Sequence, residues 1–203
     1  MIEMQGKEEF ASERIAQLPL VKQCIESAWD NYTKLYSPDL RARHSARTRA
    51  SLIHDEIVLE AEVLFDNVSG VRFERRSHAF LVYVGQRLVI RFKKFGPSFS
   101  VSGIPTQQHL SLINQQFTLP DFGEMMTIHA GYKLNMLETA LEGTYVVCPR
   151  GYGKHWFLNL KDIEDRNSVP NIVQLPIQPQ KQVAGFTPKL VPKIDKEAEG
   201  GSI

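Results

Sequence analysis

The sequence predicts an α+β domain in which N-terminal helices pack on a mostly antiparallel sheet, followed by a disordered C-terminal tail. Three observations lead to this fold class. The apolar residues recur with a helical period up to about residue 66, with a period of two after Gly70, and without any period from about residue 167. We therefore expect one domain over residues 1–166, helical over 7–66 and sheet-rich over 70–160, and a tail over 167–203.

The helical half contains two apolar stripes. Residues 7–36 are expected to be helical with a kink at Pro19, because apolar side chains recur there at three- and four-residue spacing. Pro38 ends this helix, since a proline restricts the residue that precedes it. A second helix is expected over 46–66, with a buried stripe of Ala50, Ile53, Ile57, Ala61 and Leu64.

The sheet half begins with a hairpin. An apolar strand over 79–84 leads through a tight turn at Gly85 and Gln86 into a strand over 88–93, in which apolar and basic residues alternate. A short helix is expected to begin at Pro105 and Thr106. The remaining strands are expected over 125–134 and 144–149, with a last hairpin that passes through Gly151 and Gly153.

Residues 167–203 carry Pro170, Pro176, Pro179, Pro188 and Pro192 and have no periodic apolar pattern. A segment that buries little apolar area does not offset the entropy lost on ordering. The tail is therefore expected to be disordered.

Bulk composition excludes several classes of protein. The net charge of +1 provides no overall field toward nucleic acid or acidic membranes, so stable DNA binding is not expected. Cys24 and Cys148 form no CxxC motif and suit buried thiols in a reducing compartment. The N-terminus lacks the apolar core of a signal peptide, and no apolar run approaches the length of a membrane span. A cytoplasmic protein without membrane contact is expected.

Standard catalytic motifs do not occur in the sequence. It has no glycine-rich phosphate loop, no GxSxG and no GxGxxG. His54, Asp55 and Glu56 resemble half of a zinc-protease motif, but Val58 stands where the second histidine is required. The sequence therefore predicts neither a metal site nor a cofactor.

The second helix carries the strongest group of catalytic candidates. At 100° per residue, Arg49, Glu56 and Glu60 fall within about 40° of one another at the edge of the apolar stripe, whereas Asp55 points toward solvent. Carboxylates at the border of a core can acquire different pKa values, which leaves one of them to act as a base. The alternative interpretation is a set of ordinary surface charges at the rim of the core.

Two further groups are binding candidates. Arg91 and Lys93 lie on the polar face of their strand, where a bidentate guanidinium and an ammonium suit a phosphate, although they also suit a charged sheet edge. Gln107 follows the Thr106 cap, and its amide suits the edge of a nucleobase, although a plain capped helix explains it equally. Tyr132 is a candidate for stacking on a base, or an aromatic residue of the core.

Five segments between roughly residues 40 and 160 form a recognisable series. They are RTRASLIHDEIV at 47–58, LVIRFKKF at 88–95, IPTQQ at 104–108, GYKLN at 131–135 and VVCPRG at 146–151. Taken in this order, they resemble the toxin half of the RosmerTA toxin–antitoxin phage-defence systems. These small bacterial proteins are encoded beside a regulator with helix-turn-helix and metallopeptidase-like domains. The resemblance leaves out the tail.

The resemblance implies a toxin that its partner regulator keeps inactive, and a nucleosidase that removes the purine base from nucleosides and nucleotides. Such hydrolysis requires a carboxylate to position water and a polar group to hold the base, and it requires no metal. On the residues alone, the catalytic candidates are Glu56, Glu60, Asp55 and Arg49, and the substrate-binding candidates are Arg47, Arg91, Lys93, Gln107 and Tyr132.

Two alternatives belong to other classes. One is a ribonuclease in which Arg47, Arg49, His54 and Lys93 hold RNA. The other is a non-catalytic protein-interaction module, which would show no turnover.

Overall fold

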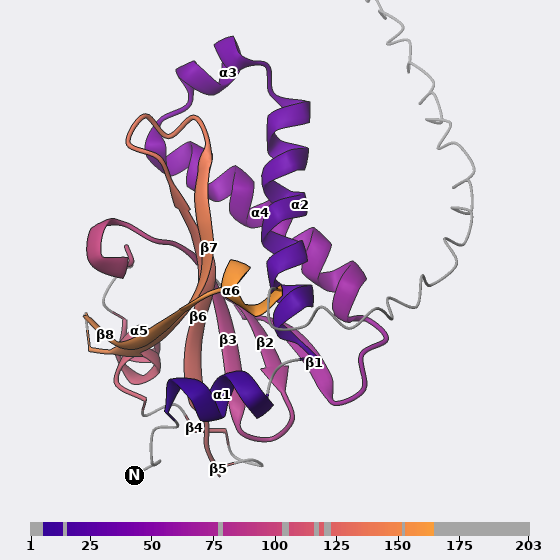
Figure 1. Cartoon of the computed structure of the whole chain (residues 1–203), viewed down its shortest axis with the longest axis vertical. Helices are drawn as coiled ribbons and strands as arrows, with labels where there is room; N and C mark the ends of the chain where they lie inside the picture. The colour runs from indigo at the N-terminus through magenta and orange to yellow at the C-terminus, as the bar shows by residue number, and fades with distance from the viewer. Residues whose placement is uncertain are drawn as a thin grey trace, which may run out of the picture. The chain divides into compact units, whose positions relative to one another are not determined.

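The computed structural model describes residues 6–13, 16–76, 79–102, 106–115, 118–119, 123–151 and 153–164, all within one compact unit (Figure 1). Helices and a mostly antiparallel sheet make up this unit, so the predicted α+β class is confirmed. The expected tail over 167–203 lies outside the described residues, and so do Ile104 and Pro105.

The first helical segment is divided in two. Helices α1 (Lys7–Glu13) and α2 (Leu18–Leu35) replace the kinked helix predicted over 7–36. Pro19 lies in the first turn of α2, where its missing N–H breaks no helical hydrogen bond. The proline therefore begins a helix instead of kinking one.

Serine caps begin the next two helices. Ser37 caps α3 (Pro38–Arg43), a short helix that the sequence did not predict. Ser45 caps α4 (Ala46–Phe65) by accepting a hydrogen bond of 3.1 Å from an amide of its first turn. None of the described helices combines the length and the apolar character that crossing a membrane requires.

Helices α2 and α4 lie against each other, and the apolar stripes predicted for them pack on the sheet (Figure 1). Between the two helices, Asn31 of α2 faces Glu56 and Glu60 of α4. The buried members of the predicted stripes are Val21, Cys24, Ile25, Ala28, Tyr32, Ile53, Ile57 and Ala61. The predicted Ala50 and Leu64 are only half-buried, and Phe65 is buried at the end of α4 instead.

The main sheet of the described chain has six strands in the order β1-β2-β3-β6-β7-β8. Neighbouring strands are antiparallel, except that β3 runs parallel to β6. Among the described strands, the short β4 and β5 pair with each other and with no other strand. The bounds are β1 (Val71–Arg76), β2 (Ala79–Val84), β3 (Leu88–Lys94), β4 (Thr118–Leu119), β5 (Gly123–Glu124), β6 (Met126–Leu134), β7 (Leu141–Arg150) and β8 (Gly153–Asn159).

The predicted hairpin of β2 and β3 is confirmed, with a turn one residue longer than expected. Gly85, Gln86 and Arg87 separate the paired ends of the strands. Gly85 has a φ of +60°, a left-handed conformation that glycine adopts without a steric penalty.

The two faces of the sheet have different coverings. Leu88 and Ile90 of β3 pack in the core formed with α2 and α4, which we call the helix face. Val89 packs on the opposite side with Leu112 of α5 (Gln107–Ile113), which we call the α5 face. Because side chains alternate along a strand, Arg91 lies on the α5 face with Val89.

Candidate functional site

Arg91 and Lys93 belong to a cluster on the α5 face. Arg91 is directly opposite His129 of β6 in the parallel pairing, and its Nη1 lies 3.4 Å from Nδ1 of His109 on α5. A guanidinium only donates hydrogen bonds, so Nδ1 of His109 is the acceptor and the imidazole is neutral. We call Arg91, Lys93, His109 and His129 the β3 cluster.

Burial lowers every pKa in the β3 cluster, and neighbouring cations lower those of Lys93, His109 and His129 further. Burial lowers the pKa of Lys93 to about 8, and Arg91 contributes to this effect. Burial also lowers the pKa of Arg91 and, together with Arg91 and Lys93, the pKa of His109. His129 is 1% exposed, and burial followed by the neighbouring cations lowers its pKa to about 3. The two histidines are therefore neutral at physiological pH.

The β3 cluster has no anionic partner in the described part of the chain. No described carboxylate lies within ion-pair distance of Arg91 or Lys93, and Nε2 of the buried His129 has no hydrogen-bond partner there. Buried cations are normally paired, because removing an unpaired charge from water is costly. The cluster therefore has the charge and the unused donors to hold an anion.

The influence of the cluster extends to α4. The described pairing of β2 with β3 ends at Arg91. Beyond Arg91, β3 is paired with β6 on one side and with no described strand on the other side. Burial lowers the pKa of His54. The charges of Lys93 and Arg91 lower this pKa further, whereas the charge of Asp55 raises it. The charges of Arg91 and Lys93 therefore act on a histidine of α4 as well as on the two histidines of the β3 cluster.

The predicted carboxylates lie on the other side of the sheet, between α2 and α4. Asn31 of α2 donates a hydrogen bond of 2.9 Å from Nδ2 to Glu60 Oε1 and one of 3.5 Å to Glu56 Oε2. Burial raises the pKa of Cys24 to about 12, and the charge of Glu60 contributes to this shift. We call Asn31, Glu56 and Glu60 the interhelical cluster.

Arg49 and Tyr132 come together at the helix-face end of the β6–β7 hairpin. Glu138 in this hairpin forms ion pairs with Lys94 and with Arg49, whose Nε lies 3.2 Å from Oε2 without the geometry of a hydrogen bond. Burial and Glu138 raise the pKa of Tyr132, while Arg49 opposes them. The buried hydroxyl of Tyr132 has no hydrogen-bond partner among the described residues. The hydroxyl of Tyr32 nearby forms a hydrogen bond of 3.1 Å with Nδ1 of His44.

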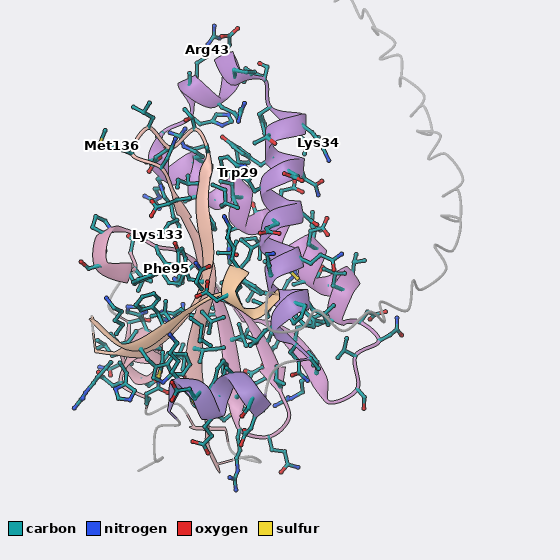
Figure 2. All side chains as sticks on the ribbon, viewed as in Figure 1. Trp29, Lys34, Arg43, Phe95, Lys133 and Met136 are labelled. Carbon is teal, nitrogen blue, oxygen red and sulfur yellow. The ribbon has the colours of Figure 1, made fainter. Side chains whose placement is uncertain are left out.

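Figure 2 shows this end of the molecule, with Met136 at the tip of the β6–β7 hairpin and Arg43 on α3.

The structure divides the predicted site residues between the two faces of the sheet. Glu56, Glu60, Arg49 and Tyr132 are on the helix face, whereas Arg91 and Lys93 are on the α5 face.

The remaining predicted residues join neither group. Asp55 and Arg47 are exposed on α4. For Asp55, this exposure agrees with its predicted angular position on the helix. Gln107 is exposed in the first turn of α5, after the Thr106 cap that accepts a hydrogen bond from the amide of His109. In the described residues, no group of three His, Cys, Asp or Glu side chains is placed to hold a metal ion.

The sequence did not reveal the histidine members of the β3 cluster. His109 and His129 have no ligand-like spacing to each other or to Arg91. Their proximity depends on the parallel pairing of β3 with β6 and on the packing of α5, both of which join distant parts of the chain. Glu138 gave no signal either, because it lies in a turn.

No family model, no curated protein and no solved structure matches this chain. The resemblance to the RosmerTA toxins therefore stays a prediction, and the chemistry of the two clusters is the main guide to function.

Proposed function

We propose that this protein binds a phosphate group of RNA at the β3 cluster and cleaves the strand there. One observation carries the proposal: two cations and two neutral imidazoles are packed together without a carboxylate among the described residues. A phosphodiester supplies the missing negative charge and acceptors for Arg91, Lys93 and the imidazole N–H groups.

Lys93 is the proposed proton-transfer group. With a pKa of about 8, roughly one Lys93 amine in ten is neutral at pH 7, which suits a general base. The amine takes the proton of a ribose 2′-hydroxyl, and that oxygen attacks the adjacent phosphorus. Arg91 stabilises the charge on the non-bridging oxygens. The bond from phosphorus to the 5′-oxygen breaks, and Lys93 returns the proton to this leaving group.

The test is incubation of single-stranded RNA with the purified protein. We expect products with 2′,3′-cyclic phosphate and 5′-hydroxyl ends, a rate that rises toward pH 8 as Lys93 loses its proton, and loss of activity in Lys93→Met. Lys34→Met is the matched control, because Lys34 is exposed on α2. Intact RNA with folded protein, or an active Lys93→Met variant, would contradict the proposal.

A nucleosidase is the second candidate, and the interhelical cluster favours it. Asn31 holds two carboxylates together, on the same flank of α4 as Arg49. A carboxylate held in this way can position the attacking water. Release of free purine base from nucleotides, lost in Glu56→Gln and retained in Lys93→Met, would support this reaction and would argue against RNA cleavage.

Either activity suits the toxin of a toxin–antitoxin pair, which is the biological setting implied by the resemblance. The test is growth of bacteria after induced expression, with and without the regulator encoded beside the gene. We expect growth arrest with wild type, recovery with the regulator, and no arrest with the inactive variant. Normal growth with soluble wild-type protein would contradict a toxin.

A further inference from the structure

The loop after β3 holds an aromatic ring against the last two strands. Phe95 bridges to Val101, and the amide of Gly96 donates a hydrogen bond of 2.8 Å to the carbonyl of Ser100. Between them, Ser98 and Phe99 have φ values of 54° and 63°, which non-glycine residues rarely adopt. A strained conformation persists only where surrounding contacts stabilise it.

Those contacts are aromatic. The ring of Phe99 lies 4.5 Å from that of Phe157 on β8 and 5.0 Å from that of Tyr145 on β7, measured between centroids. Phe157 is 38% exposed although it is a large apolar residue on a sheet. We call Phe99, Tyr145 and Phe157 the aromatic platform.

Lysines surround the aromatic platform. Lys133 and Lys154 place Nζ 4.8 Å and 5.0 Å from the centroid of Phe99, and Lys7 lies 5.8 Å from that of Phe157. Lys154 also donates to the carbonyl of Ser98, at 3.4 Å. At the base of this loop, the amide of Phe95 donates a hydrogen bond of 2.8 Å to the carbonyl of Tyr132, the residue before Lys133; both Phe95 and Lys133 are labelled in Figure 2.

Two carboxylates lie nearby and leave the lysines in excess. Glu142 is 3.9 Å from Lys133 and its side chain is half exposed, so this ion pair is weak. Glu142 and Asp162, after burial, raise the pKa of Tyr145. In the described part of the chain, three ammonium groups lie over the rings, and only Lys133 among them has a carboxylate within ion-pair distance.

The platform is on the same face of the sheet as the β3 cluster. Arg91 is paired with His129, His129 with Val147, and Val147 with Phe157, which gives one row of side chains across four strands. Three strand spacings separate Arg91 from Phe157, about 14 Å along the row. A strand of a few nucleotides spans such a distance.

We propose that the aromatic platform binds single-stranded RNA, with a base stacked on Phe157 and the lysines at the phosphates. This inference rests on the proposed function for the identity of the ligand. Stacking on an aromatic ring accepts any unpaired base, and lysines beside the ring follow the backbone. The platform positions the strand so that a neighbouring phosphate reaches the β3 cluster.

The test is fluorescence polarisation with a short fluorescein-labelled oligouridine. We expect Phe157→Ala to weaken binding by about 5- to 100-fold, because one stacked base is lost. Phe157→Trp retains affinity and Phe157→Leu does not, which separates stacking from simple apolar contact. Removal of one lysine, for example in Lys154→Gln, is expected to reduce the slope of the logarithm of the binding constant against the logarithm of the salt concentration by about 0.7 in magnitude.

Leu59→Ala is the control, since Leu59 is an exposed apolar residue of α4. Unchanged affinity in Phe157→Ala, or equal binding of duplex RNA, would overturn the platform. In Lys93→Met we expect the oligouridine to remain bound and uncleaved. If the wild-type protein binds the oligouridine but does not cleave it, the proposed function alone is refuted. If the wild-type protein cleaves it and Phe157→Ala leaves the affinity unchanged, the platform alone is refuted.

Discussion

Replacement of Lys93 by methionine is expected to stabilise the fold while it removes function. The side chain of Lys93 is half-buried beside Arg91 without a described anionic partner. Methionine keeps most of the aliphatic length and removes the charge. In most proteins the loss of a buried polar residue lowers stability, so the sign of this effect is diagnostic.

The magnitude follows from the pKa of Lys93, which is lowered from 10.5 to about 8. This difference corresponds to about 3 kcal/mol, the cost of keeping the ammonium charged in the folded state. Solvent reaches part of the side chain and screens this cost. We expect the free energy of unfolding of Lys93→Met to exceed that of wild type by about 1–2 kcal/mol at pH 7.

The pH dependence has a defined sign. Below pH 8, Lys93 is protonated in the folded and the unfolded states, and the full cost is present. Between pH 8 and 10.5 the folded protein releases the proton while the unfolded chain keeps it, so wild-type stability rises relative to the variant. The advantage of Lys93→Met therefore disappears by about pH 10.5.

Urea denaturation of both proteins at several pH values between 6.5 and 10.5 measures this difference. Inorganic phosphate is expected to stabilise wild type more than the variant, because a ligand that binds only the folded state raises its stability. A Lys93→Met protein that is less stable at pH 7, or a difference independent of pH, would refute the reasoning.

Two other changes test how the parts are held. Asn31→Ala leaves Glu56 and Glu60 without their shared donor, and we expect a loss of about 1–3 kcal/mol in the free energy of unfolding, measured with urea; an unchanged midpoint would contradict this role. A methyl group at Gly131 would overlap the carbonyl oxygen of Lys93, so Gly131→Ala is expected to separate β3 from β6 and cost more than about 3 kcal/mol. Normal protection of the β6 amides from hydrogen exchange in Gly131→Ala would show that the two strands tolerate the added methyl group.

The sequence predicted the elements that depend on local pattern. The stripes of α2 and α4 are buried because their apolar spacing matches the helical period, and the β2–β3 hairpin follows from alternation around Gly85. The angular argument also placed Glu56 and Glu60 on one flank. It did not indicate that Asn31 of another helix faces that flank, because helix packing joins residues far apart in sequence.

The functional faces were less predictable. Alternation correctly placed Arg91 and Lys93 on one side of β3, but nothing local showed that Glu56 would lie on the other side of the sheet. The net charge of +1 indicated no preference for nucleic acid. That average conceals the lysines beside Phe99 and Phe157, which the loop after β3 gathers in one place.

The single parallel pairing divides the sheet into two halves of consecutive strands. Strands β1 to β3 and strands β6 to β8 are each joined by short antiparallel connections, which form quickly from local contacts. The pairing of β3 with β6 closes the long connection between Lys94 and Met126, and its loop-closure entropy makes it a late step of folding. Arg91 comes from the first half and His129 from the second. A growing chain in which β6 has not yet emerged from the ribosome therefore lacks His129 and has no complete β3 cluster. The cluster forms only after the residues of both halves have been synthesised.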